Sequence, residues 1–423
     1  MASEKTPVLY LSYDGLTDPL GQSQILPYII GLAQRGYSFT VISTEKQDNY
    51  RKRAKFVDSL IQPFGADIDW QPIFYTKKPP VLSTLLDAWR MRRRAIRLHK
   101  QKKFKIVHCR SYVTALVGGF LQEKYGLAFV FDMRGFWADE RVEGGLWNLE
   151  KKLYRRVYDF FKRKEKEFLQ QANFTISLTA SAKREILSWE GFANVPIQVI
   201  PCCVDMKLFS SEKLRAAYLD QWWNRFNILP EELVVSYLGS LGTWYMVDEM
   251  LQFYQVLERR YPESKFLFIT PDDPQIVMEK VRQMGMEQRK FVFYRAERTE
   301  VPVLLKLSQV SLFFIRPSFS KKASSPTKMG EILATGVPVI CNAGVGDTDL
   351  LMESHQLGGL IRDFTEPEYE RTVNELDGYL KLPPEQLRRA ALEHFDLQRG
   401  VELYGEVYDG IMKETLTARK PAE

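Results

Sequence analysis

A short stretch in the second half of the chain combines a helix start, a cation and an acid. Ser325 is a typical N-cap residue and Pro326 fits the first helical position, which predicts a helix from Pro326 that stops at Gly336. Lys328 lies in its first turn, where unpaired backbone N–H groups and the helix dipole favour a phosphate. Glu331 follows on the same helix and can accept hydrogen bonds from a sugar hydroxyl. The segment therefore predicts an anion site beside an acid.

Charged and glycine-containing segments also follow strands in the first half. Asp132 ends the apolar run LAFVFD and Arg134 follows it; both are candidate active-site groups, the alternative being a pair that braces the loop. The loop DGLTDPLGQSQ lacks the G-x-G-x-x-G dinucleotide pattern. Its Gly21, Gln22 and Ser23 can offer backbone N–H groups to a phosphate or an acceptor hydroxyl, or they form a plain capped turn.

Strands and helices that could position these residues alternate in both halves of the chain. Apolar runs predict strands, with helices between, over 8–12, 39–43, 104–108, 127–132, 175–178, 197–200, 233–239, 265–270, 291–294, 311–316 and 337–342. This order favours an α/β fold of two doubly wound domains, with a boundary between Pro201 and Glu231. Ligands bind outside the carboxyl ends of the strands in such sheets, which is where the candidate residues lie.

Five segments in sequence order, PLGQSQ, DMRGFW, IPCCVD, SSPTKMGE and AGVGD, resemble family-4 retaining glycosyltransferases. The resemblance covers nearly the whole chain and implies the GT-B fold, in which two Rossmann-like domains face each other across a cleft. It implies an acceptor-side domain over 1–205 and a nucleotide-sugar donor domain over 206–395. A helix over 396–423 is implied to cross back to the first domain.

The resemblance also implies roles for residues in the second half. Glu331 matches the glutamate that holds the nucleotide ribose, and the helix start faces the diphosphate. The implied donor-binding residues are Gly239, Ser240, Arg295, Ser324, Ser325, Thr327, Lys328 and Glu331. Several positions depart from the family pattern: Ala323 replaces its first glutamate, and Asp132 replaces a histidine beside the donor sugar. Ser240, Thr243 and Trp244 stand where an Arg and a Lys often clamp the diphosphate.

The implied reaction is transfer of a sugar with retention from a nucleotide donor, expected to be UDP-linked, to a hydroxyl acceptor. Polysaccharide or glycolipid biosynthesis is the expected setting. Two alternatives stay open: a nucleotide-sugar epimerase, and a non-catalytic nucleotide-binding scaffold, which Ala323 and the missing clamp favour. We expect no cofactor and no metal, because the D-x-D string at Asp347 and Asp349 is read as chance and the four cysteines lack ligand spacing.

The composition of the chain indicates which partners and which cellular location to expect. The chain has 423 residues, 45% hydrophobic and 26% charged, which fits two globular domains. It has neither a signal-like start nor a membrane-spanning apolar run, which predicts a cytoplasmic protein. Basic segments over 90–105 and 151–166 predict helices that bind an anionic membrane surface from its inner face, or core helices with a wet basic face. Without a recognised module, no nucleic-acid partner is expected.

Overall fold

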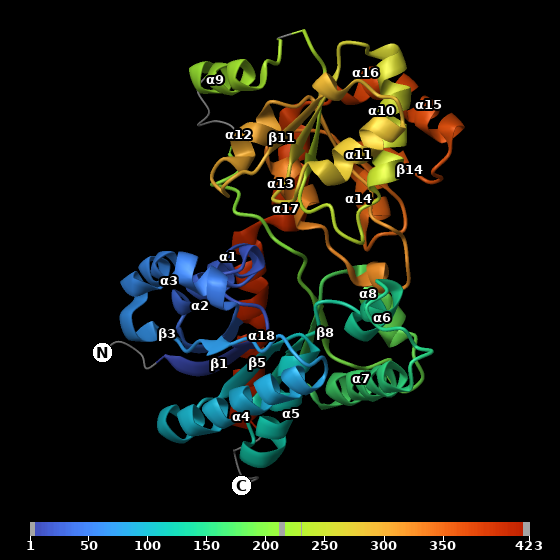
Figure 1. The fold of residues 1–423 in the computed structure, drawn as a ribbon. Coiled ribbons are helices and arrows are strands. Elements are labelled where there is room, and N and C mark those ends of the chain that lie inside the picture. The colour runs from blue at the N-terminus through green and yellow to red at the C-terminus, as the bar shows by residue number, and fades with distance from the viewer. Residues whose placement is uncertain (1–4, 211–215, 230, 418–423) are drawn as a thin grey trace. The chain divides into compact units, whose positions relative to one another are not determined.

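Two compact units make up the part of the chain that the computed structural model describes, residues 5–210, 216–229 and 231–417. The first unit extends to Pro201 and takes up the chain again at Leu397, whereas the second runs from Cys202 to Asp396. The sequence-based division placed these changes after residues 205 and 395. Figure 1 shows that each unit has a sheet flanked by helices, so each has its own core.

The sheet of the first unit has the strand order β3-β2-β1-β5-β6-β7-β8, and β4 pairs with the end of β2. Its strands are β1 (Thr6–Ser12), β2 (Tyr37–Glu45), β3 (Ile68–Trp70), β4 (Ile73–Phe74), β5 (Ile106–Arg110), β6 (Ala128–Asp132), β7 (Phe174–Ser177) and β8 (Ile197–Val199). The parallel register aligns Ser12 with Arg110, and Arg110 with Asp132. Three polar residues therefore end neighbouring strands at the carboxyl edge of the sheet.

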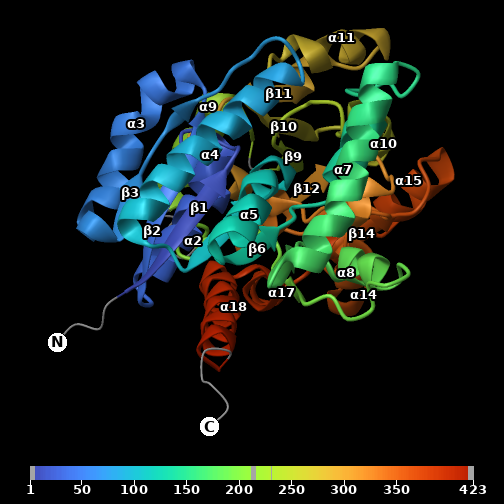
Figure 2. The ribbon, with the colours of Figure 1, turned by 90° about the horizontal axis from the view of Figure 1, so that it is seen from below.

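Helices cover both faces of this sheet. They are α1 (Pro19–Gln24), α2 (Leu26–Ala33), α3 (Gln47–Ile61), α4 (Leu82–Lys102), α5 (Tyr112–Tyr125), α6 (Trp137–Glu143), α7 (Lys152–Gln171), α8 (Ala180–Leu187) and α18 (Leu397–Thr417). The strand order reverses after β3, so right-handed crossovers place α2 and α3 on one face and α4 and α5 on the other. Figure 2 shows α4 beside α5, and these two helices pack together, as do α18 and α2. The last helix thus belongs to the first unit.

The sheet of the second unit has the order β11-β10-β9-β12-β13-β14. Its strands are β9 (Val234–Leu238), β10 (Lys265–Ile269), β11 (Phe291–Tyr294), β12 (Val310–Phe313), β13 (Val339–Asn342) and β14 (Gly358–Ile361). Its helices are α9 (Ala216–Phe226), α10 (Val247–Arg260), α11 (Gln275–Gln283), α12 (Val301–Lys306), α13 (Thr327–Ala334), α14 (Thr348–His355), α15 (Glu366–Asn374), α16 (Leu376–Tyr379) and α17 (Pro384–Phe395). Helix α10 packs on α15, and α13 packs on α17.

The predicted α/β class with two Rossmann-like units is confirmed. Strands such as β9 are apolar on both faces, with Val234 1% and Val235 0% exposed, because helices cover both sides of a parallel sheet. The strand expected over 311–316 stops at Phe313, and β3, β4 and β14 were not expected. Among the described residues, no helix combines the length and apolarity needed to cross a membrane.

Candidate functional site

Helix α13 presents Lys328 in its first turn, packed against two tyrosines. Lys328 is 7% exposed, and its Nζ lies 3.7 Å from the centre of the Tyr245 ring and 4.4 Å from that of Tyr237. The same ammonium donates a hydrogen bond to the Tyr237 hydroxyl at 3.3 Å. Burial lowers the pKa of Lys328 well below its ordinary value, although Glu331 opposes the shift. A nearby phosphate would favour the charged ammonium, so this position suits an anionic ligand.

Gly239 provides the space that the Lys328 ammonium occupies. Its φ of +124° favours glycine, and a Cβ at this position would lie 2.9 Å from Lys328 Nζ. The next residue, Ser240, has an exposed side chain, while its carbonyl accepts a hydrogen bond from the Tyr237 hydroxyl. The loop after β9 is therefore shaped around the ammonium by its backbone.

Glu331 lies one turn further along α13 and is paired with Arg298. Arg298 Nη1 donates to Glu331 Oε1 at 3.0 Å, and Glu331 is 8% exposed. Burial raises the pKa of Glu331, with Arg298 and Lys328 opposing the shift. Sequence reasoning did not assign Arg298, which is 33 residues from its partner. The one feature of the sequence that could have indicated Arg298 as a site residue is its position just after β11, at the carboxyl end of a strand.

Ser325 does not cap α13, and this prediction was wrong. Pro326 occupies the N-cap position with an extended backbone, and no side chain caps the helix there. The Ser325 hydroxyl instead accepts the Cys202 N–H at 3.1 Å, which ties the start of α13 to the first residue of the second unit. Ser324 and Thr327 are half-buried beside it. The helix begins at Thr327, so Lys328 is its second residue.

Two cations on the loop before α13 stack on Trp244. The Arg316 guanidinium carbon lies 4.8 Å from the centre of the indole, and Lys321 Nζ lies 3.8 Å from it. Lys322 is exposed, whereas Lys321 is only 6% exposed. Such cation–π contacts hold positive charge close to the start of α13. Trp244 lies in the loop where the family often has a cationic clamp, and here it holds two cations from another loop against its ring.

Asp349 of the D-x-D string closes the glycine turn after β13. Its two carboxylate oxygens accept the Gly344 N–H at 3.0 and 3.2 Å. The Gly346 N–H donates to the Lys321 carbonyl at 2.8 Å, so the turn also braces the loop before α13. These contacts give Asp349 a structural role.

Asp132 is the centre of a buried polar cluster in the first unit. It is 0% exposed, and its Oδ2 accepts the Tyr404 hydroxyl at 3.2 Å and lies 3.4 Å from His108 Nε2. Arg110 Nη1 lies 3.7 Å from Oδ2, and Arg134 Nη1 lies 3.8 Å from Oδ1. Burial alone would raise the pKa of Asp132, but Arg134, His108 and Arg110 together hold it below its ordinary value. The carboxylate is therefore ionised and positions the cations around it.

Arg134 is the member of this cluster that reaches the surface. Its side chain is 11% exposed, and its φ of +59° is unusual for a residue with a Cβ. Ser111, after the neighbouring strand, also has a positive φ of 70°. Such conformations cost about 1 kcal/mol or more and gather at functional sites. Of the two predicted catalytic residues, Arg134 is the one that a ligand could touch.

His108 is a hydrogen-bonded histidine of the core. It is 1% exposed, stacks on Tyr10 with ring centres 4.5 Å apart, and pairs its Nδ1 with the Tyr408 hydroxyl at 2.7 Å. Burial lowers its pKa, although Asp132 opposes the shift. Tyr404 and Tyr408 come from α18, so the last helix completes the cluster.

Glu45, which sequence reasoning missed, anchors the loop after β1. Its carboxylate is 0% exposed and accepts the N–H groups of Leu16 at 2.7 Å and Thr17 at 3.2 Å. Gly21 packs against this turn, because a Cβ there would lie 2.1 Å from the Gly15 carbonyl oxygen. A buried acid at the end of a neighbouring strand left no pattern in the sequence.

Gln22 cannot supply its backbone N–H to a phosphate as predicted. That N–H donates to the Asp18 carbonyl at 3.1 Å within the short helix α1. The Gln22 side chain donates to the Thr17 carbonyl at 3.3 Å, and Ser23 is half-buried next to it. Gln22 thus lies inside a short helix without a side-chain cap, which also differs from the capped turn that was the alternative.

Comparison with known proteins shows which family model and which solved structures this chain resembles. Residues 28–208 match the model of the family described as Glycosyltransferase Family 4. A comparison with curated proteins by sequence finds no match. Among solved structures, sucrose-phosphate synthase from Thermosynechococcus elongatus has a TM-score of 0.71 at 13% identity, covering 97% of this chain and 100% of that one.

Two further solved structures agree over almost the full length. A glycosyltransferase from Rickettsia africae has a TM-score of 0.69 at 15% identity, covering 97% of this chain and 99% of that one. The Anabaena protein HepE, in complex with UDP and glucose, has a TM-score of 0.67 at 15% identity, covering 95% and 99%. The chain has the GT-B fold. The resemblance to family-4 glycosyltransferases that the sequence motifs indicated is confirmed.

Within the second unit of this GT-B chain, one end of α13 gathers most of the predicted donor-binding residues. Gly239 and Lys328 are in contact, and Glu331 lies on the next turn of the helix. Arg295 is exposed after β11, and no contact joins it to these residues in the described structure. Asp132, Arg134 and the loop with Gly21 belong to the first unit.

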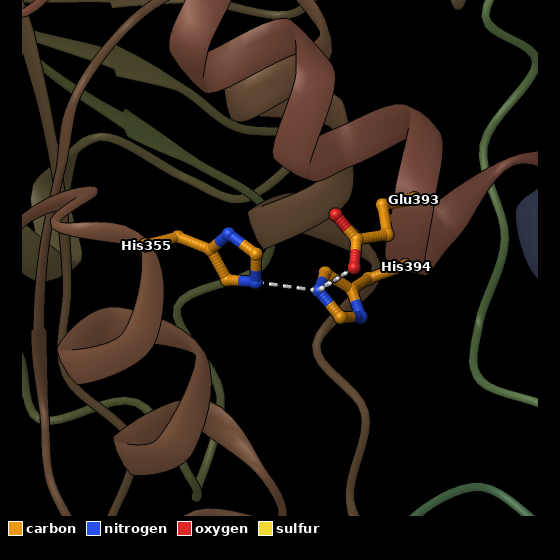
Figure 3. A group of neighbouring side chains, drawn as sticks. All are labelled: His355, Glu393 and His394. Atoms are coloured by element: carbon orange, nitrogen blue, oxygen red, sulfur yellow. Dashed lines mark hydrogen bonds and ion pairs between the residues drawn. The ribbon is translucent and has the colours of Figure 1, made fainter.

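A pair of histidines in the second unit was also missed from the sequence. His355 ends α14 and His394 lies near the end of α17; their Nε2 atoms are 2.8 Å apart, and Glu393 Oε1 lies 3.7 Å from His394 Nε2. Figure 3 shows the two rings facing each other through these nitrogens. Two nitrogens on one tetrahedral zinc lie about 3.3 Å apart for Zn–N bonds of 2.0–2.1 Å. The observed spacing is that of a hydrogen bond, which joins the ends of the two helices.

Proposed function

We propose that this protein is a glycosyltransferase that moves a sugar from a nucleotide donor, expected to be UDP-linked, to a hydroxyl acceptor. The observation that carries the proposal is the placement of Lys328 and Glu331 on successive turns of α13. One is a buried cation against the Gly239 loop, and the other is a buried acid oriented by Arg298. The GT-B fold and the match to the family-4 model support it.

The proposed roles follow from charge and position. Lys328 and the start of α13 face the diphosphate, and Glu331 holds the ribose hydroxyls. When the bond from the anomeric carbon to the phosphate oxygen breaks, its electron pair stays on the diphosphate, where Lys328 stabilises the added negative charge. Arg316 and Lys321, stacked on Trp244, add positive charge to the same loop. This arrangement compensates for the absent Arg/Lys clamp.

The acceptor side is assigned to the first unit. The acceptor hydroxyl oxygen forms the new bond on the face that the phosphate leaves, and its proton passes to the departing diphosphate, which gives retention. Arg134 is the proposed contact to acceptor or sugar, and Asp132 is a positioning residue that fixes Arg134. The reaction is proposed to need no metal, because Lys328 and the helix start supply the positive charge.

Two other functions, epimerisation and nucleotide binding without catalysis, can be distinguished from sugar transfer by their products. An epimerase would convert a nucleotide sugar without any acceptor, and a scaffold would bind nucleotide without turnover. Ala323, at the position of the family's first glutamate, is the observation that favours a scaffold. We put transfer first, and its support is that a buried cation and a buried acid lie on successive turns of α13.

A melting-temperature panel with UDP, GDP, ADP, CDP and dTDP and their common sugars tests the proposal. A ligand that binds the native state raises the melting temperature with its concentration. We expect a shift with UDP and its sugars, followed by release of UDP that depends on an added glycan or lipid-linked acceptor. No shift with any nucleotide would refute the donor site, and a shift without release would support the scaffold.

The setting of the reaction is part of the same proposal. A glycan or lipid-linked acceptor places the enzyme in polysaccharide or glycolipid biosynthesis, at the inner face of the membrane. The segments 90–105 and 151–166 were the predicted contacts with an anionic membrane surface.

A further inference from the structure

Exposed apolar side chains gather at one place in the first unit. Six of the 14 exposed large apolar side chains in the described structure lie within 16 residues of sequence. They are Phe74 (50% exposed), Tyr75 (42%), Leu82 (63%), Leu85 (53%), Leu86 (38%) and Trp89 (47%). We call these six residues the 74–89 face. Single exposed apolar residues need no explanation, but a contiguous patch marks an interaction surface.

The helical spacing shows that core packing does not explain this face. Its four members on α4 recur at intervals of three and four residues, which places them on one stripe of the helix. A different stripe of α4 faces the core, with Asp87, Met91, Ala95 and Leu98 buried. The helix therefore has two apolar stripes, and the side chains of the outer one are 38–63% exposed.

Asp87 fixes the two parts of the 74–89 face to each other. This carboxylate is 0% exposed and accepts hydrogen bonds from the Thr76 N–H at 3.0 Å, the Thr76 hydroxyl at 2.7 Å and the Tyr13 hydroxyl at 3.2 Å. Tyr75 also packs edge-on against Tyr13, with ring centres 6.0 Å apart. The segment after β4 is thus held on the first turns of α4, close to the loop that follows β1.

The charges around the face are almost all positive. Residues 71–105 contain eleven Lys and Arg and a single acid, which is the buried Asp87. Lys77 and Lys78 are exposed beside Tyr75, and the exposed Arg93 stacks on Trp89 with its guanidinium carbon 4.7 Å from the ring centre. An apolar stripe bordered by cations, with Trp and Tyr among its members, matches the chemistry of a bilayer with anionic headgroups.

We propose that the 74–89 face and its flanking cations dock this protein on an anionic lipid bilayer. The apolar side chains enter the headgroup region, while Lys77, Lys78 and the arginines of α4 meet the lipid phosphates. The inference does not depend on glycosyl transfer, but it would hold the loop after β1, the predicted acceptor side, at the lipid surface. A lipid-linked acceptor could then be reached without leaving the membrane.

Helix α7, the second basic segment, lacks such a face. Phe161, Phe168 and Leu169 point into the core, and Leu153 is the one large apolar side chain of α7 that is exposed. Its Lys162 is held by Asp139 at 2.8 Å and Glu165 at 2.5 Å. The alternative of a core helix with a wet basic face therefore describes α7, and it provides matched controls.

Co-sedimentation of the full-length protein with phosphatidylcholine vesicles, with and without phosphatidylglycerol, tests the proposal. Two variants address the face: Leu85→Ser with Trp89→Ser, and Lys77→Glu with Lys78→Glu. Two controls make like changes on α7: Leu153→Ser, at 54% exposure against 53% for Leu85, and Arg155→Glu with Arg156→Glu. The melting shift with UDP is recorded on every sample, so failure of the nucleotide site is seen separately.

We expect the wild type to bind only the anionic vesicles, and less well at high salt. Each variant of the face should lower the apparent vesicle affinity by about tenfold or more, because each basic residue near the surface contributes substantially. The α7 controls should bind within about twofold of the wild type. Absence of wild-type binding, unchanged binding by both face variants, or equal losses in the α7 controls would each overturn the proposal. A Lys77/Lys78 effect without a Leu85/Trp89 effect would also overturn it, because the apolar stripe is the core of the inference.

Discussion

Arg298 Nη1 donates to Glu331 Oε1 at 3.0 Å and so fixes the acid of α13 from outside the helix. The acid is 8% exposed, and its neighbour on the previous turn is the Lys328 cation. A buried carboxylate without these cations would favour its neutral form. The ribose contact proposed for Glu331 therefore depends on a residue that is distant in the sequence.

Replacement of Glu331 should weaken nucleotide binding. Glu331→Gln keeps the shape of the side chain but removes its charge, and a hydrogen bond to a charged group contributes about 1.5–3 kcal/mol, or roughly tenfold or more in Kd. Calorimetric titration with UDP measures the change. Glu353→Gln, on the exposed face of α14, is the control. An unchanged Kd for UDP in Glu331→Gln would remove the ribose assignment.

Lys328 should take up a proton when a diphosphate binds. Burial holds its pKa well below the ordinary value in the free protein, and an adjacent anion would raise it. Titration of UDP in Tris and in HEPES at the same pH should then give different observed enthalpies, since the buffers differ in ionisation enthalpy. Lys328→Met should abolish that difference and weaken UDP at least tenfold, whereas the exposed Lys381→Met should do neither. Equal enthalpies in both buffers for the wild type would contradict the prediction.

Stability should fall as the pH drops below about 6.5, the ordinary histidine pKa. Burial lowers the pKa of both His108 and His394 in the folded state, with Asp132 and Glu393 in opposition. The unfolded chain then binds more protons than the folded one, so the free energy of unfolding rises with pH across this window. Urea unfolding from pH 5.5 to 7.5 measures the slope. His394→Gln should make the slope of the unfolding free energy against pH smaller than in the wild type. Glu331 and Glu165 are present in both proteins, so their contributions cancel in the difference. An unchanged slope would refute the contribution of His394.

Removal of divalent metal should leave activity intact. Asp349 uses its carboxylate to bind the Gly344 N–H, so the D-x-D string acts as a turn. Transfer assays in EDTA should give the same rate as untreated enzyme. Asp349→Asn should lower the melting temperature and have only a small effect on the transfer rate at saturating donor. Full loss of activity in EDTA that Mn²⁺ restores would show that the string is a metal site.

The candidate site was predicted best where its residues are close in sequence. Lys328 and Glu331 share one helix, and local helix-start chemistry was enough to place both, even though Pro326 and not Ser325 is the N-cap. The contacts of Asp132 were not predictable in this way, since its partner Tyr404 lies 272 residues away. Glu45 shows the same limit, because a single acid at a strand end has no periodic pattern.

The sequence by itself determined the alternation of strands and helices, the two-unit α/β fold and the charge of the exposed segments. These follow from apolar runs and from turn and cap residues, which act over a few positions along the chain. Only the tertiary structure decided which polar groups are buried together, as with Arg298 and Glu331, and which apolar residues stay outside, as with Leu85 and Trp89. Burial depends on what packs against a side chain, and in a parallel sheet those neighbours come from strands and helices far apart in the sequence.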